Sequence, residues 1–275
     1  MLFTHTLLPL LTSAALAFAL PTDDCDPKDH HGRPTNWPGK HHNPPTHEPA
    51  YFLLAGDSTT APQNTGGGGW GNGFLNTTLR SPASGRNLGV NGRTTVSFVE
   101  DGYWADTLAL AHNHSTTHSV YITLQFGHND QKPAANISLS DYGSNLLSLA
   151  SQARQAGAEP ILITPLTRRS FSGSPPRINL SLANETRITR EVAEENDIRW
   201  IDLNGASTAY CNAIGPEAAH GYNLVPEDNT HLNEHGSVVF GRMVSDLLVE
   251  KYGDIKFWTK PDRRISRKIE NGVPA

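Results

Sequence analysis

Five short apolar runs, separated by segments long enough for helices, constrain the fold of this chain more than any other feature. The first is YFLLAG at residues 51–56, an apolar stretch ending in glycine, as is typical of a buried strand. Similar runs follow at residues 86–92, 119–127, 159–165 and 197–203. Strands that alternate with helices pair in parallel and are covered by helices on both faces. The sequence therefore predicts an α/β fold, a three-layer α/β/α sandwich around a five-stranded parallel sheet.

The segments between these runs predict the helices. The last has apolar residues at helical spacing between residues 238 and 248. The predicted helices cover residues 96–111, 139–155, 182–195 and 234–251. A chain of 275 residues has enough sequence for one large domain with a full core. We place this domain at residues 51–260, followed by a C-terminal tail at residues 261–275.

The N-terminus predicts export. Residues 7–20, LLPLLTSAALAFAL, form an apolar run with small residues at Ala17 and Ala19, which predicts a signal peptide at residues 1–19. A membrane anchor is the alternative, but a span needs about 20 apolar residues, and polar residues follow this run at once. We expect a secreted, extracellular protein with no membrane segment.

Residues 20–50 predict a tail rather than a folded unit. They are rich in Pro, His, Asp and Gly and almost devoid of apolar side chains after Leu20, so they cannot bury enough surface to fold alone. Their histidines are candidate ligands for a transition metal. Because no ligand pattern with fixed spacing is present, a solvated linker is the favoured interpretation, and no metal site is predicted.

Two further features agree with a secretory route. Two cysteines, Cys25 and Cys211, are predicted to form a disulfide, with two unpaired thiols as the alternative. Five N-x-[ST] sequons are candidate glycosylation sites: Asn76, Asn113, Asn136, Asn179 and Asn184.

Charge and surface pattern exclude some partners. The net charge of −5 indicates no basic surface for nucleic acid or an anionic membrane, so neither is expected as a partner. No long apolar surface pattern is present, and a monomer is expected.

Polar residues follow three of the predicted strands, where ligands bind in open parallel sheets. Asp57 and Ser58 follow the first strand, and Gly92 and Arg93 follow the second. The third strand ends in GHND at residues 127–130. Since the carboxyl ends of parallel strands share one edge of the sheet, these groups are predicted to meet there.

These residue types suit acyl transfer. A serine hydroxyl needs a base to take its proton, and the base needs a third group to orient it. Ser58 is the candidate nucleophile, His231 the base, and Asp228 the group that binds the other imidazole nitrogen. The candidate oxyanion donors are the backbone N–H groups of Ser58 and Gly92 and the side-chain amide of Asn129.

Each residue also has a structural interpretation. Gly-Asp-Ser is a common turn, and Asp228 is suited to cap a helix. The Asn129 amide is able to satisfy loop backbone groups. The combination, with each residue after the expected element, favours a catalytic site.

Two more residues are candidate substrate contacts. The Trp70 ring could stack on a sugar or pack against the scaffold, and the two interpretations stay open. His128 could face the cleft or be a hydrogen-bonded structural histidine, which is the safer interpretation.

The motifs AGDST, NLGVNGRT, FGHND and DNTH resemble the four motif blocks of the SGNH (GDSL-type) hydrolases. With LAGDST at residues 54–59 and GWG at residues 69–71, the chain is most similar to the rhamnogalacturonan acetylesterases. The resemblance spans residues 51–250. It implies the flavodoxin-like SGNH fold, the same nucleophile, base and oxyanion donors, and no cofactor.

The sequence therefore predicts a secreted serine esterase that removes acetyl groups from an acetylated plant cell-wall polysaccharide. Alternatives are an acetylxylan or other carbohydrate acetylesterase, or a lipase or thioesterase of the same fold, which would need a large apolar cleft. A non-catalytic carbohydrate-binding protein would not need nucleophile, base and oxyanion donors together. A metal-dependent deacetylase would need a cluster of His and Asp ligands, which is found only in the tail.

Overall fold

The computed structural model describes residues 48–275, which form one compact unit. The strands of its main sheet are β1 (Ala50–Gly56), β2 (Ser84–Asn87), β3 (Ser119–Gln125), β4 (Ala158–Ile163) and β7 (Arg199–Ile201). They lie in the order β2-β1-β3-β4-β7, and every neighbouring pair is parallel. The predicted five-stranded parallel sheet is confirmed.

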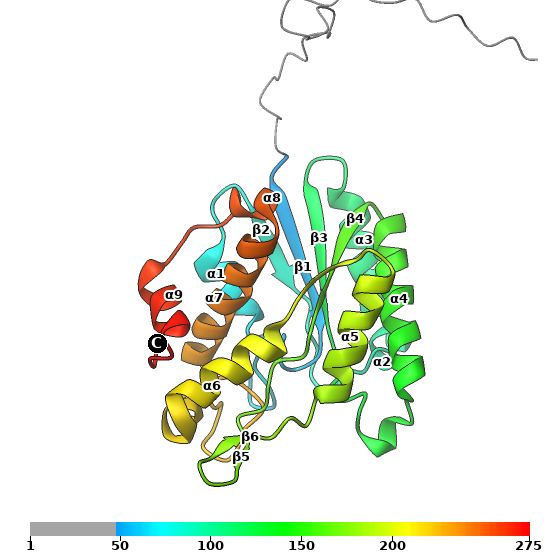
Figure 1. Cartoon of the computed structure of the whole chain (residues 1–275). Coiled ribbons are helices and arrows are strands. Elements are labelled where there is room, and N and C mark those ends of the chain that lie inside the picture. The colour runs from blue at the N-terminus through cyan, green and yellow to red at the C-terminus, as the bar shows by residue number, and fades with distance from the viewer. Residues whose placement is uncertain (1–47) are drawn as a thin grey trace, which may run out of the picture. The chain divides into compact units, whose positions relative to one another are not determined.

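Helices cover both faces of this sheet (Figure 1). The larger ones are α1 (Gly71–Thr78), α3 (Tyr103–His114), α4 (Leu139–Gln155), α5 (Ala183–Glu195), α6 (Leu203–His220) and α7 (Glu234–Lys251). Shorter elements are α2 (Ser97–Glu100), η1 (Pro133–Ala135), α8 (Gly253–Lys256), α9 (Arg263–Glu270) and the hairpin strands β5 (Phe171–Ser172) and β6 (Arg177–Ile178).

Alternation along the strands divides the core into two layers, because successive side chains of a strand point to opposite faces. Phe52 and Leu54 of β1 pack with residues of α1, α6 and α7, whereas Leu53 and Ala55 pack with residues of α3, α4 and α5. Both faces are buried, as in a doubly covered parallel sheet. The three-layer α/β/α fold is therefore confirmed.

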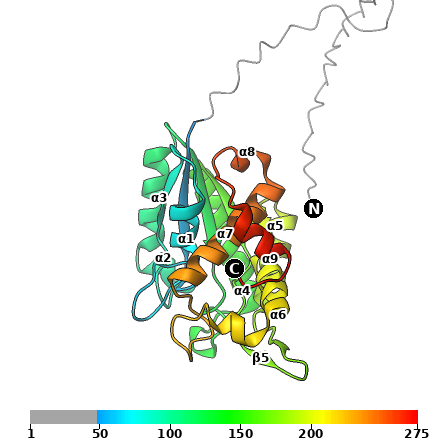
Figure 2. The same cartoon turned by 90° about the vertical axis from the view of Figure 1, so that its left-hand side faces the viewer.

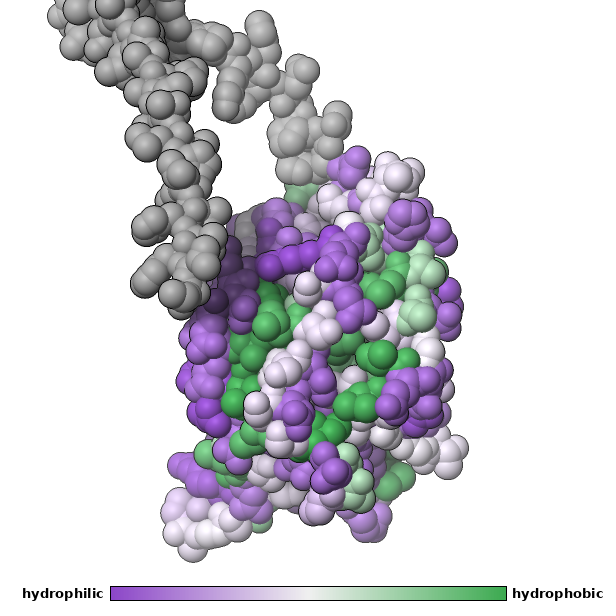
Figure 3. Space-filling model, turned by 90° about the vertical axis from the view of Figure 1, so that its right-hand side faces the viewer, coloured by the Kyte–Doolittle hydropathy of each residue, from purple (hydrophilic) through white to green (hydrophobic). Residues whose placement is uncertain are grey.

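The face that carries α4 mixes apolar and polar side chains, with apolar groups gathered near its middle (Figure 3). Leu147 of α4 is 38% exposed. Among the helices of residues 48–275, none is long and apolar enough to span a membrane.

Some predicted elements differ from the structure. The predicted helix at residues 96–111 is two helices, because Gly102 has a left-handed φ of 87° that separates α2 from α3. The second strand begins earlier than predicted, at Ser84, and already ends at Asn87. The predicted end of the strand, residues 91–92, forms a turn instead. Helices α1 and α6 were not predicted.

The prediction of a C-terminal tail at residues 261–275 is wrong, because this segment is folded. It contains α9, and Ile269 and Ala275 pack against the core. The sequence of α9 is mostly charged, which obscured the packing of its partly buried Ile269. The predicted signal peptide and almost all of the predicted N-terminal tail lie outside the described residues.

Candidate active site

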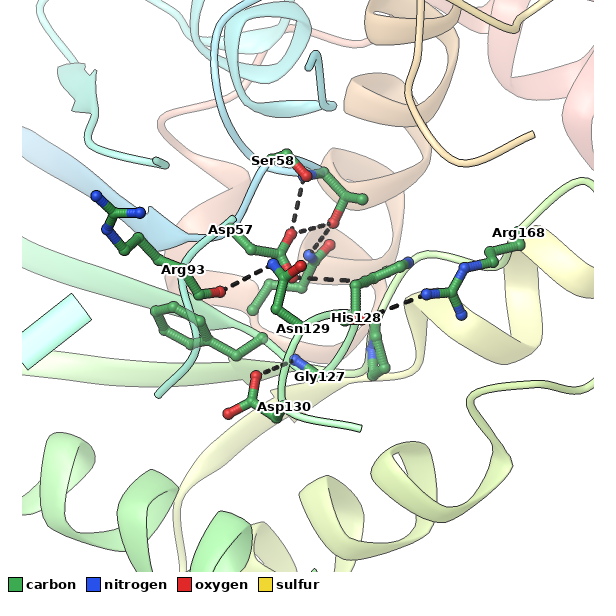
Figure 4. Close-up of polar contacts among 12 residues, drawn as sticks. Asp57, Ser58, Arg93, Gly127, His128, Asn129, Asp130 and Arg168 are labelled. Carbon is green, nitrogen blue, oxygen red and sulfur yellow. Dashed lines mark hydrogen bonds and ion pairs between the residues drawn. The ribbon is translucent and has the colours of Figure 1, made fainter. Parts of the chain in front are cut away.

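Ser58 lies in a tight turn directly after β1, at the carboxyl edge of the sheet. The Asp57 carboxylate beneath it accepts hydrogen bonds from the backbone N–H and the hydroxyl of Thr59, both at 2.8 Å. Gln125, the last residue of β3, donates its side-chain amide to the Thr59 hydroxyl. The turn is thus fixed by the side chain that follows β1 and by the side chain that ends β3; Figure 4 labels Asp57 and Ser58.

Close packing of the backbone explains the glycine that precedes this turn. A Cβ at Gly56 would come within 2.6 Å of the Gln125 carbonyl oxygen, closer than real contacts allow. The glycine lets β1 approach β3 where the Ser58 turn begins.

His231 reaches Ser58 from the loop before α7. Its Nε2 lies 2.7 Å from the Ser58 Oγ, and its Nδ1 lies 2.7 Å from the Asp228 Oδ2. A carboxylate only accepts hydrogen bonds, so Nδ1 carries the proton and Nε2 is the acceptor for the Ser58 hydroxyl. The structure therefore brings the predicted hydroxyl, imidazole and carboxylate into one hydrogen-bonded chain.

The Asp228 carboxylate also holds the loop that carries it. Its Oδ1 accepts the backbone N–H groups of Thr230 and His231, both at 2.9 Å. Burial raises the pKa of Asp228, but these hydrogen bonds and the one from the His231 ring outweigh burial, so the pKa lies below its usual value. The carboxylate stays ionised and able to orient the imidazole.

Gly92 and Asn129, the other predicted oxyanion donors, are brought next to each other. The Asn129 Nδ2 donates to the carbonyl of Arg93 at 3.0 Å, and its Oδ1 accepts from Lys132 Nζ at 2.7 Å. Gly92 has a φ of 76°, and a Cβ there would meet nothing within 4 Å, so this side of the turn faces open space.

Asp130 ties the two loops together. Its carboxylate accepts the backbone N–H of Thr95 at 2.8 Å and that of Gly127 at 3.1 Å (Figure 4). Burial raises the pKa of Asp130 despite these hydrogen bonds. The GHND segment is therefore fastened to the loop after β2.

Trp70 and His128, the two candidate substrate contacts, are both buried, so the structural interpretation holds for each. Trp70 is fully buried, and its indole N–H donates to the Gln125 side chain at 2.8 Å, so it supports the Ser58 turn from inside the core. His128 is 3% exposed, and its Nδ1 lies 3.6 Å from the Asp57 Oδ2. Burial raises the pKa of Asp57, but attraction to His128 and hydrogen bonds outweigh it, and the net pKa is lowered.

Arg169 supports the site in a way that the sequence did not reveal, although its position after β4 placed it at the active edge of the sheet. It is fully buried, its Nε donates to the Asn223 side chain at 2.6 Å, and its Nη2 donates to the His231 carbonyl at 2.7 Å. Its own backbone N–H donates to the Asn229 carbonyl at 2.7 Å. Burial lowers the pKa of Arg169 to about 10, so the guanidinium is still charged at neutral pH. Its place after β4 was the available signal.

Cys211 lies in the core with a fully buried thiol, and burial raises its pKa to about 12. Cys25 lies outside the described residues, so the disulfide stays a prediction. The candidate glycosylation sites stay predictions as well, and each of their side chains is exposed: Asn76, Asn113, Asn136, Asn179 and Asn184.

A parallel α/β sheet with a serine hydroxyl, an imidazole and a carboxylate in series at its carboxyl edge has the arrangement of a serine-type hydrolase. A model of the GDSL-like lipase/acylhydrolase family matches residues 54–238, and the chain belongs to this family. It is therefore an esterase of the SGNH class, a carboxylic ester hydrolase.

Two similar proteins are named as esterases, in agreement with this family. The rhamnogalacturonan acetylesterase RhgT of Bacillus subtilis (strain 168) is 32% identical over 74% of this chain and 91% of its own length. The probable rhamnogalacturonan acetylesterase YesY of the same organism is 29% identical over 73% of this chain and 93% of its own length.

Solved structures share the fold. Protein YxiM of Bacillus subtilis superposes with a TM-score of 0.64 and 26% identity, over 75% of this chain and 57% of that chain. The acetylxylan esterase Axe2 of Geobacillus stearothermophilus superposes with a TM-score of 0.53 and 18% identity, over 74% of this chain and 94% of its own.

Proposed function

We propose that the chain is a secreted serine esterase that removes acetyl groups from a plant cell-wall polysaccharide, with Ser58, His231 and Asp228 as its catalytic triad. The hydrogen-bonded series from the Ser58 Oγ to the His231 ring and the Asp228 carboxylate, 2.7 Å at each step, carries the proposal. The similarity to a rhamnogalacturonan acetylesterase supports a pectic substrate.

The first half of the reaction transfers the acetyl group to the enzyme. His231 Nε2 takes the hydroxyl proton of Ser58 while the Ser58 Oγ attacks the carbonyl carbon of the acetyl ester. The carbonyl oxygen becomes an oxyanion. When the tetrahedral intermediate collapses, the bond to the sugar oxygen breaks, and the imidazolium gives its proton to that oxygen.

Three donors are assigned to the oxyanion: the backbone N–H groups of Ser58 and Gly92 and the Asn129 side-chain amide. The Asn129 Nδ2 has two hydrogens, and one is bound by the Arg93 carbonyl. The second is assigned to the substrate. Because Lys132 holds the Asn129 Oδ1, the amide keeps its nitrogen on the side of the Arg93 carbonyl.

The second half releases acetate. His231 takes a proton from water, the resulting hydroxide attacks the acetyl carbon, and the Ser58 Oγ leaves with the proton from the imidazolium. In both halves Asp228 stabilises the imidazolium without itself being protonated.

The test compares acetate release from acetylated rhamnogalacturonan and acetylated xylan. We expect wild type to act on the pectic substrate, and Ser58→Ala to lower the rate by roughly 10⁴-fold or more while the protein stays folded. Ser140→Ala, at an exposed serine of α4, is the matched control.

The outcomes separate mechanism from substrate. Acetate release from acetylated xylan alone would support the catalytic triad but contradict the proposed pectic substrate. An active Ser58→Ala variant would refute the mechanism.

A further inference from the structure

The C-terminal part of the chain is basic although the whole chain is acidic. The net charge is −5, yet residues 256–270 contain six basic side chains against two acidic ones. Five of the six basic side chains are exposed. A concentration of one sign of charge attracts ligands of the opposite sign, which makes this segment a candidate binding surface for an anion.

The fold adds two arginines to the same face. The segment before α9 runs along the end of α1: the Arg80 N–H donates to the Trp258 carbonyl at 2.8 Å, and the Lys260 N–H donates to the Thr78 carbonyl at 2.8 Å. Helix α9 lies beside α7 (Figure 2), which supplies Arg242. The basic segment is thus held against the body of the domain.

Two cavities lie between these basic side chains. The first, of about 450 Å³, is bordered by Arg80 and Lys256. The second, of about 710 Å³, is bordered by Lys260 and Arg263. Arg242 lines both cavities. The cations therefore surround concave sites instead of being spread over a convex surface.

The carboxylates of these cavities are already engaged. Asp246 accepts the Ser266 hydroxyl at 2.6 Å and lies 3.4 Å from the Arg242 Nη1. Asp262 caps the first turn of α9 by accepting the Arg264 N–H at 3.0 Å. In the part of the chain that the structure describes, four basic side chains of the cavity walls form no ion pair: Arg80, Lys256, Lys260 and Arg263.

Arg242 has donor capacity left over. It is 2% exposed, and its Nη2 donates to the Lys260 carbonyl at 3.0 Å. Its Nε is buried and has no hydrogen-bond partner among residues 48–275. A buried donor without a partner is costly, and an anionic oxygen in either cavity is the kind of group that would satisfy it.

Cations that border a concave site suit a sugar ring that carries a carboxylate, because the carboxylate pairs with the cations.

An anionic membrane fits this face less well. A basic amphipathic helix binds a bilayer by inserting its apolar side. In α9 that side is turned to the protein: Ile269 packs against the core, and Ile265 is only partly exposed. The cations also converge on cavities, which admit a chain rather than a flat surface.

We propose that these two cavities form a second carbohydrate site, which binds the carboxylates of a uronate-containing polysaccharide. Helix α7 begins three residues after His231, and its rise of about 1.5 Å per residue places Arg242 roughly 12 Å along it. Arg242 lines both cavities, so both lie along α7 beyond the loop of His231. The role in turnover rests on the proposed function, whereas the binding does not.

The test measures binding of an oligogalacturonide without acetyl groups to the Ser58→Ala protein by calorimetry, with a neutral xylo-oligosaccharide of equal length as the comparison ligand. The protein is first treated with a glycosidase, because Asn76, a candidate glycosylation site, borders the second cavity. Lys260→Glu and Lys256→Glu each change one exposed side chain, and Arg190→Glu, on the exposed side of α5, is the control.

We expect the oligogalacturonide to bind and the neutral ligand not to bind. Each cavity variant should weaken the affinity by about tenfold, the control should not, and added salt should weaken binding further. In a background with Ser58 intact, hydrolysis of a small aryl acetate should be unchanged, while KM for an acetylated acidic polysaccharide rises and kcat stays.

Equal oligogalacturonide affinity in wild-type and variant cavities would overturn the proposal. A second result would also overturn it: the unmodified cavities bind phosphatidylserine vesicles but not the oligogalacturonide, and the variants lose the vesicle binding. That result would assign the face to a membrane. Because binding is measured without turnover, the binding result would remain valid even if Ser58 were not the nucleophile.

Discussion

The two sides of the active site are built in different ways. The nucleophile side is held by strands: Asp57 and Thr59 are fully buried, and Gln125 bonds to them from the end of β3. The base side is a loop, in which Asp228 and His231 have side chains 24% and 21% exposed. Strand ends fix a residue through the sheet itself, whereas a loop needs separate contacts to hold it. Here Asp228 and Arg169 supply them.

Asp228→Asn tests the base side with the largest expected effect. The amide nitrogen would face the His231 ring and favour the tautomer that cannot accept the Ser58 proton. We expect kcat to fall by roughly 10³- to 10⁴-fold with the fold intact. Measured acetate release and a circular-dichroism spectrum check this, and Glu227→Gln, at the exposed preceding residue, is the control. A near-normal kcat would show that the aspartate does not orient the imidazole.

Arg169→Gln tests whether the clamp behind the loop matters to chemistry. It removes the donor to the His231 carbonyl, so the imidazole loses its fixed distance to Ser58. A misplacement of about 1 Å costs roughly 100-fold in rate, so we expect kcat to fall by about 10- to 100-fold, with a smaller change in KM. Arg169→Lys keeps one donor and should recover part of the loss.

The control for this clamp is Arg168→Gln, at the neighbouring arginine, which is half-buried and donates to the His128 carbonyl at 3.3 Å. It should affect kcat less. If Arg169→Gln lowered only the free energy of unfolding and left kcat unchanged, Arg169 would serve stability alone.

Acid stability compares the two sides through Asp57 and Asp228, whose pKa values both lie below the usual value. Such carboxylates stabilise the folded state above their unfolded pKa of about 3.9, and this stabilisation is lost as pH falls through the lowered folded pKa. Urea unfolding should therefore show a free energy of unfolding that declines below about pH 4.

Asp228→Asn and Asp57→Asn should each make this decline shallower, because each removes a carboxylate whose folded pKa is lowered. Equal slopes in wild type and both variants would contradict the pKa directions.

The sheet and the residues of the site could be predicted because their signals are local. A strand buried on both faces reads as an apolar run, and turn residues directly after it mark the edge of the sheet. Helix α6 was missed because small residues blur its periodicity and Gly215, with a φ of 78°, interrupts it.

The burial of Trp70 and Arg169 depends on contacts far apart in sequence. Trp70 is buried because the glycines before it let the backbone pack on Thr59, which no local pattern records. Nothing local distinguishes buried Arg169 from its half-exposed neighbour Arg168. Their roles depend on contacts made in the folded chain: Trp70 bonds to Gln125, and Arg169 bonds to the carbonyl of His231.

The most direct test of the account is to trap the acyl-enzyme. Protein mixed with an aryl acetate is quenched in acid during turnover, digested, and examined by mass spectrometry. The account predicts an acetyl group on Ser58 in wild type and none on that peptide in Ser58→Ala. Turnover that continues with no acetyl group on Ser58, or with acetyl found on another side chain that is needed for activity, would contradict it.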